Sequence, residues 1–577
     1  MQASRGPLNT RLRTSAIDML CLSAVWFASL LIVNPIGDFP LNDDWSFGRT
    51  VKHWLDSGEF RPAGWFPMPF LTNAIWGYLF CSPFGFSFTV LRSSTLTLSW
   101  VGILGTYALV RQTDQPRWLA VLIALTLAFN PLYYALSNTF MTDVPFSALM
   151  ILAGIFFARA LKSDSYVDLL IATAFATAAT LSRQLGLAST IAFTITAVLV
   201  RRPLTIRCLL RASTPPIVAG GALLLFQRTL QASHRLPAVY QARTEYLANV
   251  ITEPSALLHS QSMVPKNLHL GALYLGLFLL PVLIFLVAKI LQSHKKQGII
   301  LLCLAAGLLA LRSGVLVSRN RSLFMPLSHN VLIGSGIGPL TLRDTYILSL
   351  DNVPWLGWGF WFVVTAMSAI GATLLIALVT WATARFVRDW WLNNLGANRV
   401  VGLFFLLTGI VYLGPLVITS FYDRYLVPLI PFFAIAIACA CDQGQRAHRE
   451  TLTVTRWVSL ATLLAMTVFA IGATRDYLAW NRLRWEAIHH LMNDRGIAAT
   501  SIDGGFEFGG LYLSGSGRRK LDPTKSWWWV RDDTYLIAFG NVPGYETLKE
   551  YQYFNWIGPR VGKILVLQKI AAKPPDP

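Results

Sequence analysis

Charged residues are scarce in this sequence: they make up 13% of its 577 residues, whereas 54% are hydrophobic. Soluble domains of average composition carry about 25% charged residues. Apolar runs of about 18 to 25 residues recur along most of the chain, which is the length that a membrane-spanning helix needs. These runs lack the period-2 alternation of a transmembrane barrel, so the composition predicts an α-helical polytopic membrane protein.

Several catalytic and metal-binding signatures are also missing. The six cysteines form neither a disulfide framework nor a zinc-binding spacing, and the nine histidines show no metal-ligand spacing. A glycine-rich phosphate-binding loop and the turn that carries a nucleophilic serine are both absent. The sequence therefore supports neither nucleotide hydrolysis nor serine-based catalysis. It contains no internal repeat, which weighs against a transporter built from duplicated halves.

Positive charge is abundant, with a formal net charge of +19. Much of the lysine and arginine lies in short links between apolar runs, which is the bias of cytoplasmic loops in membrane proteins. Scattered in this way, the basic residues form no stripe of the kind that binds nucleic acid. The first apolar run follows a basic segment and no cleavage site follows it, so we expect a retained anchor with a cytoplasmic amino terminus.

The apolar runs predict about thirteen membrane helices and place the carboxyl terminus outside the cytoplasm. They cover residues 15–35, 87–110, 117–135, 144–160, 166–182, 185–200, 208–226, 270–291, 298–317, 358–384, 400–420, 425–441 and 457–474. The transmembrane domain then spans residues 1–474, with long outer loops at 36–86, 227–269 and 318–357. In the first loop, residues 43–58 and 70–80 are amphipathic and rich in Trp and Phe, which predicts helices in the membrane interface or an aromatic belt.

Residues 475–577 combine a helical pattern with short strand patterns, which predicts a small periplasmic α+β domain. Two of its motifs, "DGGFEFGG" and "KSWWWVRDD", are candidate contacts for an acceptor. A glycine-rich turn and an aromatic packing cluster are the simpler interpretations.

An acidic doublet, Asp43-Asp44, closely follows the first apolar run. A carboxylate costs roughly 2.5 to 3.5 kcal/mol at the bilayer centre, so a pair at the mouth of a membrane helix favours a role in chemistry. Either aspartate is a candidate general base for an acceptor hydroxyl. The alternative is helix capping, since the doublet precedes a predicted helix that begins at Trp45.

Two further candidates lie in short outer turns. Asp143 is a second candidate catalytic carboxylate, although an aspartate just before an early proline also caps a helix. Arg183 lies where the charge bias disfavours a cation. Its partner is either a specific lipid phosphate or an ordinary headgroup.

The late segment "DRYLVP" supplies three candidate substrate-binding residues, Asp423, Arg424 and Tyr425. Arg424 is a candidate ligand for phosphate, and a local pairing with Asp423 is the structural alternative. Arg61 in the first outer loop is a further candidate for substrate binding.

In the order of these elements, the sequence resembles polyprenyl-phosphate-dependent glycosyltransferases of the C-type membrane fold, specifically the protein O-mannosyltransferase and lipid A aminoarabinose transferase group. The resemblance covers roughly residues 15–440 and is based on the acidic doublet, "WFPMPFLTNAIWGYLF", "NPLYYALSNTFMTDVPF", "LSRQLGLAS" and "DRYLVPLIPF". The sequence departs from the family in having Asp-Asp where relatives commonly have Asp-Glu. It also has Met68 where the proline segment usually has a lysine.

The resemblance implies a role for each matched residue. Asp43 corresponds to the first-loop catalytic aspartate and Asp143 to the second-loop acid, while Arg183 lies where relatives carry a cation near the lipid phosphate. Arg424 matches the Arg-Tyr-Pro element before a late helix. No cofactor is required for the implied reaction, no metal ligand is assigned, and arginine is favoured over a divalent cation for neutralising the phosphate.

The predicted function is transfer of a sugar, with inversion at its reacting carbon, from a polyprenyl phosphate to an extracytoplasmic glycan, lipid or protein. The predicted location is a bacterial inner membrane with the active site on its periplasmic side, in contact with membrane lipids and not with nucleic acid. Two alternatives are a flippase for lipid-linked sugars, which predicts polar residues distributed through the helices, and a non-catalytic subunit of an envelope assembly complex.

Overall fold

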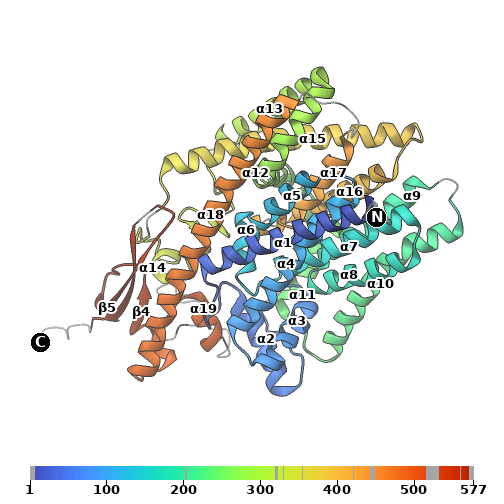
Figure 1. The fold of residues 1–577 in the computed structure, drawn as a ribbon. Helices are drawn as coiled ribbons and strands as arrows, with labels where there is room; N and C mark the ends of the chain where they lie inside the picture. The colour runs from blue at the N-terminus through green and yellow to red at the C-terminus, as the bar shows by residue number, and fades with distance from the viewer. Residues whose placement is uncertain are drawn as a thin grey trace, which may run out of the picture.

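The computed structural model describes residues 7–65, 67–201, 204–318, 323–328, 330–353, 355–419, 422–441, 449–514, 530, 532–558 and 560–570. Over these ranges the chain forms a large helical body with a small sheet near its carboxyl terminus (Figure 1).

The main helices are α1 (Pro7–Val33), α2 (Asp44–Ser57), α3 (Leu71–Phe84), α4 (Phe88–Gln112), α5 (Arg117–Ala128), α6 (Pro131–Ser137), α7 (Asp143–Ser163), α8 (Tyr166–Ser182), α9 (Leu187–Val200), α10 (Ile206–Ala232), α11 (Ala238–Thr252), α12 (Pro254–Ser293), α13 (Lys295–Ser318), α14 (Arg343–Tyr346), α15 (Trp358–Trp391), α16 (Ala397–Ile418), α17 (Leu429–Ala440), α18 (Arg449–His489) and α19 (Phe506–Phe508). The strands are β1 (Leu332–Ile333), β2 (Gly336–Ile337), β3 (Ile502–Asp503), β4 (Tyr535–Ala538), β5 (Tyr545–Phe554) and β6 (Val561–Lys569).

The helices confirm the predicted class of polytopic membrane protein. Within the described ranges, ten helices are long and apolar enough to cross a membrane, and α5 with α6 forms a further span bent by 61°. Two shorter apolar helices cover Tyr166–Ser182 and Gln184–Val200. These segments coincide in position with the predicted apolar runs. The bend has a local cause, because the Asn130 side chain accepts the backbone N–H groups of Leu132 and Tyr133 and so starts a new helix at Pro131.

The predicted outer loops carry structure of their own. The first loop folds into α2 and α3, which cover the two pieces that the sequence marks. Of these, α2 is amphipathic as predicted, whereas α3 is apolar without a distinct polar face. The second contains α11 and the start of α12, and the third contains the β1–β2 hairpin and α14. Asp43 occupies the N-cap position of α2, yet its side chain makes no capping hydrogen bond. Simple capping therefore does not explain this carboxylate.

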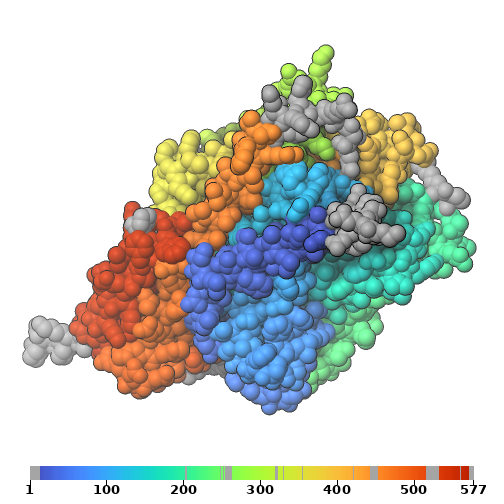
Figure 2. Space-filling view, viewed as in Figure 1, coloured from blue at the N-terminus to red at the C-terminus, as the bar shows by residue number. Residues whose placement is uncertain are grey.

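The carboxyl-terminal part begins inside a helix rather than after one, because α18 runs on through residue 475 to His489. It continues into a four-stranded sheet of order β3-β4-β6-β5, in which only β3 and β4 pair in parallel. In Figure 2 the carboxyl-terminal part of α18 (orange) lies between the sheet (red) and the amino-terminal helices (blue). Residues 525–529 and 531 of the "KSWWWVRDD" motif lie outside the described residues.

Candidate active site

Four charged side chains from distant parts of the sequence meet at one site. Arg183 donates a hydrogen bond from Nη1 to Oδ1 of Asp143 over 2.5 Å. Nη2 of Arg424 lies 3.5 Å from Oδ2 of Asp43. The two guanidinium groups share the ring of Tyr425, at 4.6 Å from Arg183 and 5.8 Å from Arg424. Two acids and two arginines that the sequence proposed separately therefore belong to one constellation.

Helix ends position these groups. Asp143 is the first residue of α7, and Arg183 follows the last residue of α8 in an extended conformation. The turn after Arg183 packs tightly, since a Cβ at Gly186 would lie 2.5 Å from the backbone nitrogen of Thr180. Arg424 lies in a short 3-10 helix, η2 (Asp423–Leu426), just before α17. Side chains on such rigid termini need little reordering when they bind a ligand.

Arg424 is a buried cation with spare hydrogen-bonding capacity. It is 7% exposed, and its Nε and Nη1 have no hydrogen-bond partner among the described atoms. A guanidinium group carries five N–H donors, and burying them without acceptors is costly. Arg424 can therefore donate hydrogen bonds to a further anion at this site.

Asp43 faces this site. Its Oδ1 accepts a hydrogen bond of 3.0 Å from the indole nitrogen of Trp65, and its Oδ2 faces Arg424. The side chain keeps 20% of its surface exposed. It is thus held in place by two neighbours while remaining open to a ligand.

Asp44 has a different environment. It is buried, and its Oδ2 accepts the backbone N–H groups of Phe140 at 3.0 Å and Leu41 at 3.4 Å. Burial raises the pKa of Asp44 to about 7, against the opposing effect of these hydrogen bonds. This carboxyl group joins the first outer loop to the turn before α7.

Asp423 also holds the backbone together. Its carboxylate accepts the N–H groups of Val331 and Leu332, at 3.1 and 2.8 Å, and that of Arg424 at 2.7 Å. It therefore fixes the β1–β2 hairpin to η2, and its hydrogen bonds serve the backbone.

The proline segment of the first loop borders the site. The Thr142 hydroxyl donates to Sδ of Met68 over 3.4 Å, and it also accepts from Arg183. The Gln184 amide donates to the carbonyl of Pro67. The position at which the resemblance expects a lysine thus lies beside the Asp143–Arg183 pair, but here it is apolar.

Arg61 lines a separate cavity of about 480 Å³ that adjoins the site. Trp65 belongs to both, since it lines the cavity and donates to Asp43. The sequence analysis missed three other side chains of this cavity, Trp45, Arg49 and His53. Their spacing of four residues along α2 is the signal that identifies them as one helix face.

Among the described residues, no group of three or more His, Cys, Asp or Glu side chains is arranged to hold a metal ion. The two ion pairs of the site combine acids with arginines, which suits deprotonation of a hydroxyl next to a phosphate.

Comparisons with known proteins support a membrane glycosyltransferase of the C-type fold. Residues 67–230 match the model of the family described as dolichyl-phosphate-mannose-protein mannosyltransferase, and this range includes Asp143 and Arg183. The match confirms the resemblance to polyprenyl-phosphate-dependent glycosyltransferases. A comparison with curated proteins gave no match.

Two crystal structures of ArnT from Cupriavidus metallidurans are similar to this chain at 13% identity. The match to the apo structure covers 87% of this chain and 85% of the ArnT chain, with a TM-score of 0.37. The match to the structure bound to undecaprenyl phosphate covers 96% of this chain and 98% of the ArnT chain, with a TM-score of 0.40.

Proposed function

We propose that the protein transfers a sugar from a polyprenyl phosphate to an acceptor hydroxyl on the outer side of the bacterial cytoplasmic membrane. The observation that carries this proposal is the convergence of Asp43, Asp143, Arg183 and Arg424, in which a buried guanidinium group retains unpaired donors. Charge-assisted hydrogen bonds from arginine suit a phosphate that becomes more negative as it leaves.

Asp43 acts as the general base in this proposal. Its carboxylate takes the proton of the acceptor hydroxyl, the oxygen forms a bond to the reacting carbon of the sugar, and the bond from that carbon to the phosphate oxygen breaks. The electron pair leaves with the polyprenyl phosphate, next to Arg424. Attack from the face opposite the leaving group inverts the configuration at that carbon.

Asp143 and Arg183 complete the phosphate side of the site. Their hydrogen-bonded contact of 2.5 Å, with both side chains less than a tenth exposed, fixes the guanidinium group over Tyr425. Asp423 positions Arg424 through the backbone, and Tyr425 forms the shared surface between the two cations. Asp44 is a loop anchor in this account and not the base.

The cavity that contains Arg61 is the approach for the acceptor, because Trp65 joins it directly to Asp43. The predicted boundary at 475 and the periplasmic placement of residues 475–577 belong to the same proposal. This part of the chain contacts the first outer loop, where the backbone N–H of Asn42 donates to Oε1 of Glu507.

A flippase for lipid-linked sugars predicts charged residues along a path through the membrane. The acids and arginines of the site instead gather at helix ends. This placement favours chemistry at one membrane face over alternating access.

Sugar transfer from defined polyprenyl-phosphate sugars to an envelope extract, measured with the purified protein in detergent, tests the assignment of the base. Asp43→Asn should lower the rate by about 100-fold or more, the range that loss of a general base typically costs. The matched variant Asp44→Asn changes the adjacent carboxylate in the same way and should keep most of the activity. Equal activity of Asp43→Asn and the wild type, or a loss confined to Asp44→Asn, would contradict the proposal.

A further inference from the structure

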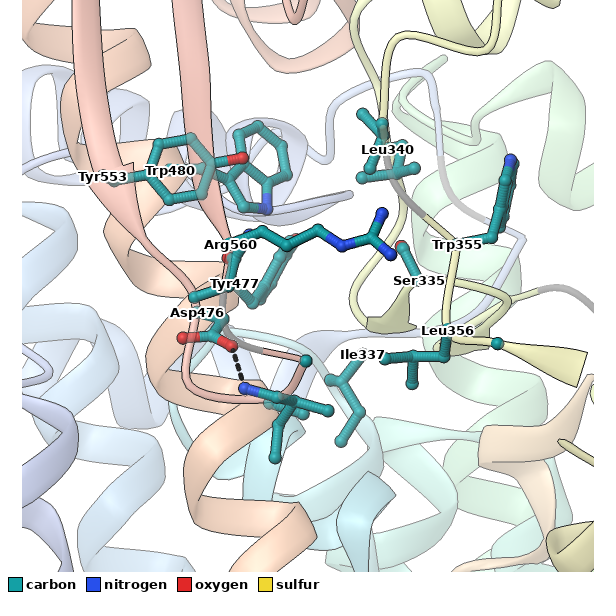
Figure 3. A pocket seen from close by; sticks show the side chains of 16 residues that line it. Ser335, Ile337, Leu340, Trp355, Leu356, Asp476, Tyr477, Trp480, Tyr553 and Arg560 are labelled. Atoms are coloured by element: carbon teal, nitrogen blue, oxygen red, sulfur yellow. Dashed lines mark hydrogen bonds between the residues drawn. The ribbon is translucent and has the colours of Figure 1, made fainter. Parts of the chain in front are cut away.

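A second cavity lies away from the charged site, where the carboxyl-terminal sheet meets the helical body (Figure 3). It has a volume of about 100 Å³ and is enclosed by the β1–β2 hairpin, the segment before α15, α18 and the β5–β6 hairpin. Sites for drug-sized ligands measure about 300 to 1,000 Å³, so this partly open cavity holds only part of a ligand as large as one sugar ring.

Aromatic side chains line this cavity on opposite sides. Trp480 and Tyr477 come from α18, Tyr553 from β5, and Trp355 from the segment before α15. Trp355 is 47% exposed, although its ring lies so close to Gly334 that a Cβ there would be 2.3 Å from it. Aromatic faces carry partial negative charge and attract polarised C–H groups, which line the faces of sugar rings.

Trp480 is held rigidly for such a role. Its ring packs edge-on against Phe539 at 5.0 Å and against Tyr477 at 5.7 Å. Tyr477 is fixed in turn by Gly338, where a Cβ would lie 2.1 Å from the ring. Rigid aromatic surfaces bind a ligand at a low cost in conformational entropy.

Arg560 gives the cavity a positive charge. It is exposed and forms no ion pair with a described residue. In Figure 3 its side chain extends from the sheet side toward Ser335 and Trp355. The nearby acid, Asp476, instead accepts the backbone N–H groups of Trp556 and Ile557 and so closes the β5–β6 turn.

The β1–β2 hairpin connects this cavity to the charged site. Its Ser335 and Ile337 line the cavity, while Val331 and Leu332 at its start donate to Asp423, the neighbour of Arg424. One short element thus borders both places.

We propose that this cavity is a second carbohydrate subsite, which binds one sugar unit bearing a carboxylate or phosphate through Trp355, Trp480 and Arg560. The assignment of this sugar to the acceptor rests on the proposed function. The proposed binding of the sugar is independent of that function, because Trp355, Trp480 and Arg560 do not belong to the proposed catalytic machinery.

Saturation-transfer NMR on the full-length protein in detergent tests the subsite, with glucuronic acid, glucose and inorganic phosphate as separate probes. Glucuronic acid should receive saturation, glucose less, and inorganic phosphate should not compete at equal concentration. Arg560→Gln and Trp355→Ala should each weaken glucuronic acid binding on the order of tenfold, as expected for one charged hydrogen bond or one stacking surface. Lys563→Gln, which removes an exposed cation of the same sheet, should leave it unchanged.

Binding should also persist in Asp43→Asn, so that failure of sugar transfer and failure of this subsite give different results. The inference is overturned if no sugar receives saturation, if inorganic phosphate competes as well as glucuronic acid binds, or if binding is insensitive to Arg560→Gln. An equal loss in Lys563→Gln would likewise overturn it, because the effect would then be one of general charge.

Discussion

At the scale of single residues, the adjacent aspartates Asp43 and Asp44 show how position decides chemistry. A fifth of the side-chain surface of Asp43 is exposed to solvent, and its carboxylate faces a cation. Asp44, in contrast, is buried against backbone N–H groups. The sequence locates the doublet but does not distinguish its two members, because both lie at the start of the same predicted helix. The two aspartates differ because Asp44 accepts a hydrogen bond from Phe140 and Asp43 accepts one from Trp65, and both partners come from other parts of the chain.

Burial of Asp44 makes the stability of the protein depend on pH. Its pKa is about 7 in the folded state and about 3.9 in an unfolded chain, so the folded state holds this proton more tightly. The resulting stabilisation is present in full below pH 4 and is lost as the pH rises through 7. We expect the apparent melting temperature of the wild type, measured in detergent at one scan rate, to fall between pH 5 and pH 8.

Asp44→Asn is the matched variant for this prediction because it keeps an acceptor for the loop N–H groups and cannot ionise. Its melting temperature should fall less over the same pH interval than that of the wild type. If both proteins show the same pH dependence, Asp44 is not the group responsible.

At the scale of elements, the apolar runs predict the helices well because length and hydropathy alone define a membrane span. The bend between α5 and α6 and the contacts between helices are not visible in this way. The contacts between helices depend on small residues, as where α12 and α15 touch: a Cβ at Gly276 would lie 2.2 Å from the backbone nitrogen of Ala372. Such close backbone approach is how membrane helices gain packing energy.

Gly276→Ala should therefore destabilise the protein, by about 1 to 3 kcal/mol, because the new methyl group overpacks the α12–α15 contact. Gly271→Ala is the control on the same helix, since a Cβ there has no neighbour within 4 Å. The comparison is made from apparent melting temperatures in detergent. Equal values for the two variants would show that this contact is looser than described.

At the scale of the whole molecule, the carboxyl-terminal part supports the first outer loop. Arg484 and Glu507 form an ion pair of 2.7 Å with neither side chain exposed, and Glu507 also accepts the N–H of Asn42, beside the acidic doublet. The two partners of that last bond are 465 residues apart. Nothing in the local sequence indicates such a contact, whereas the α+β character of the segment follows from its strand patterns.

Arg484→Met should destabilise the protein by about 3 to 5 kcal/mol, because Glu507 is left as an unpaired buried charge. The double variant Arg484→Met, Glu507→Met should lose less, since no lone charge remains. Lys563→Met, at the exposed pair with Glu550, should change little. Apparent melting temperatures compare all three. A larger loss in the double variant than in Arg484→Met would refute this role for the pair.

Much of the site was predictable at the level of residue identity. Asp43, Asp143, Arg183 and Arg424 are each candidates from the sequence alone, and the predicted topology brings them to one membrane face. Their mutual contacts were not predictable, nor was Trp65, which resembles any interfacial tryptophan until its bond to Asp43 is seen.

The central claim is tested most directly by measuring whether the bond between sugar and phosphate is broken. Purified protein is supplied with a radiolabelled polyprenyl-phosphate sugar and an envelope extract, and free polyprenyl phosphate is quantified together with labelled acceptor. We expect the two products to appear in equal amounts with the wild type and to be nearly absent with Asp43→Asn. Recovery of the lipid-linked sugar with its glycosidic bond intact, in the presence of active extract, would contradict the account.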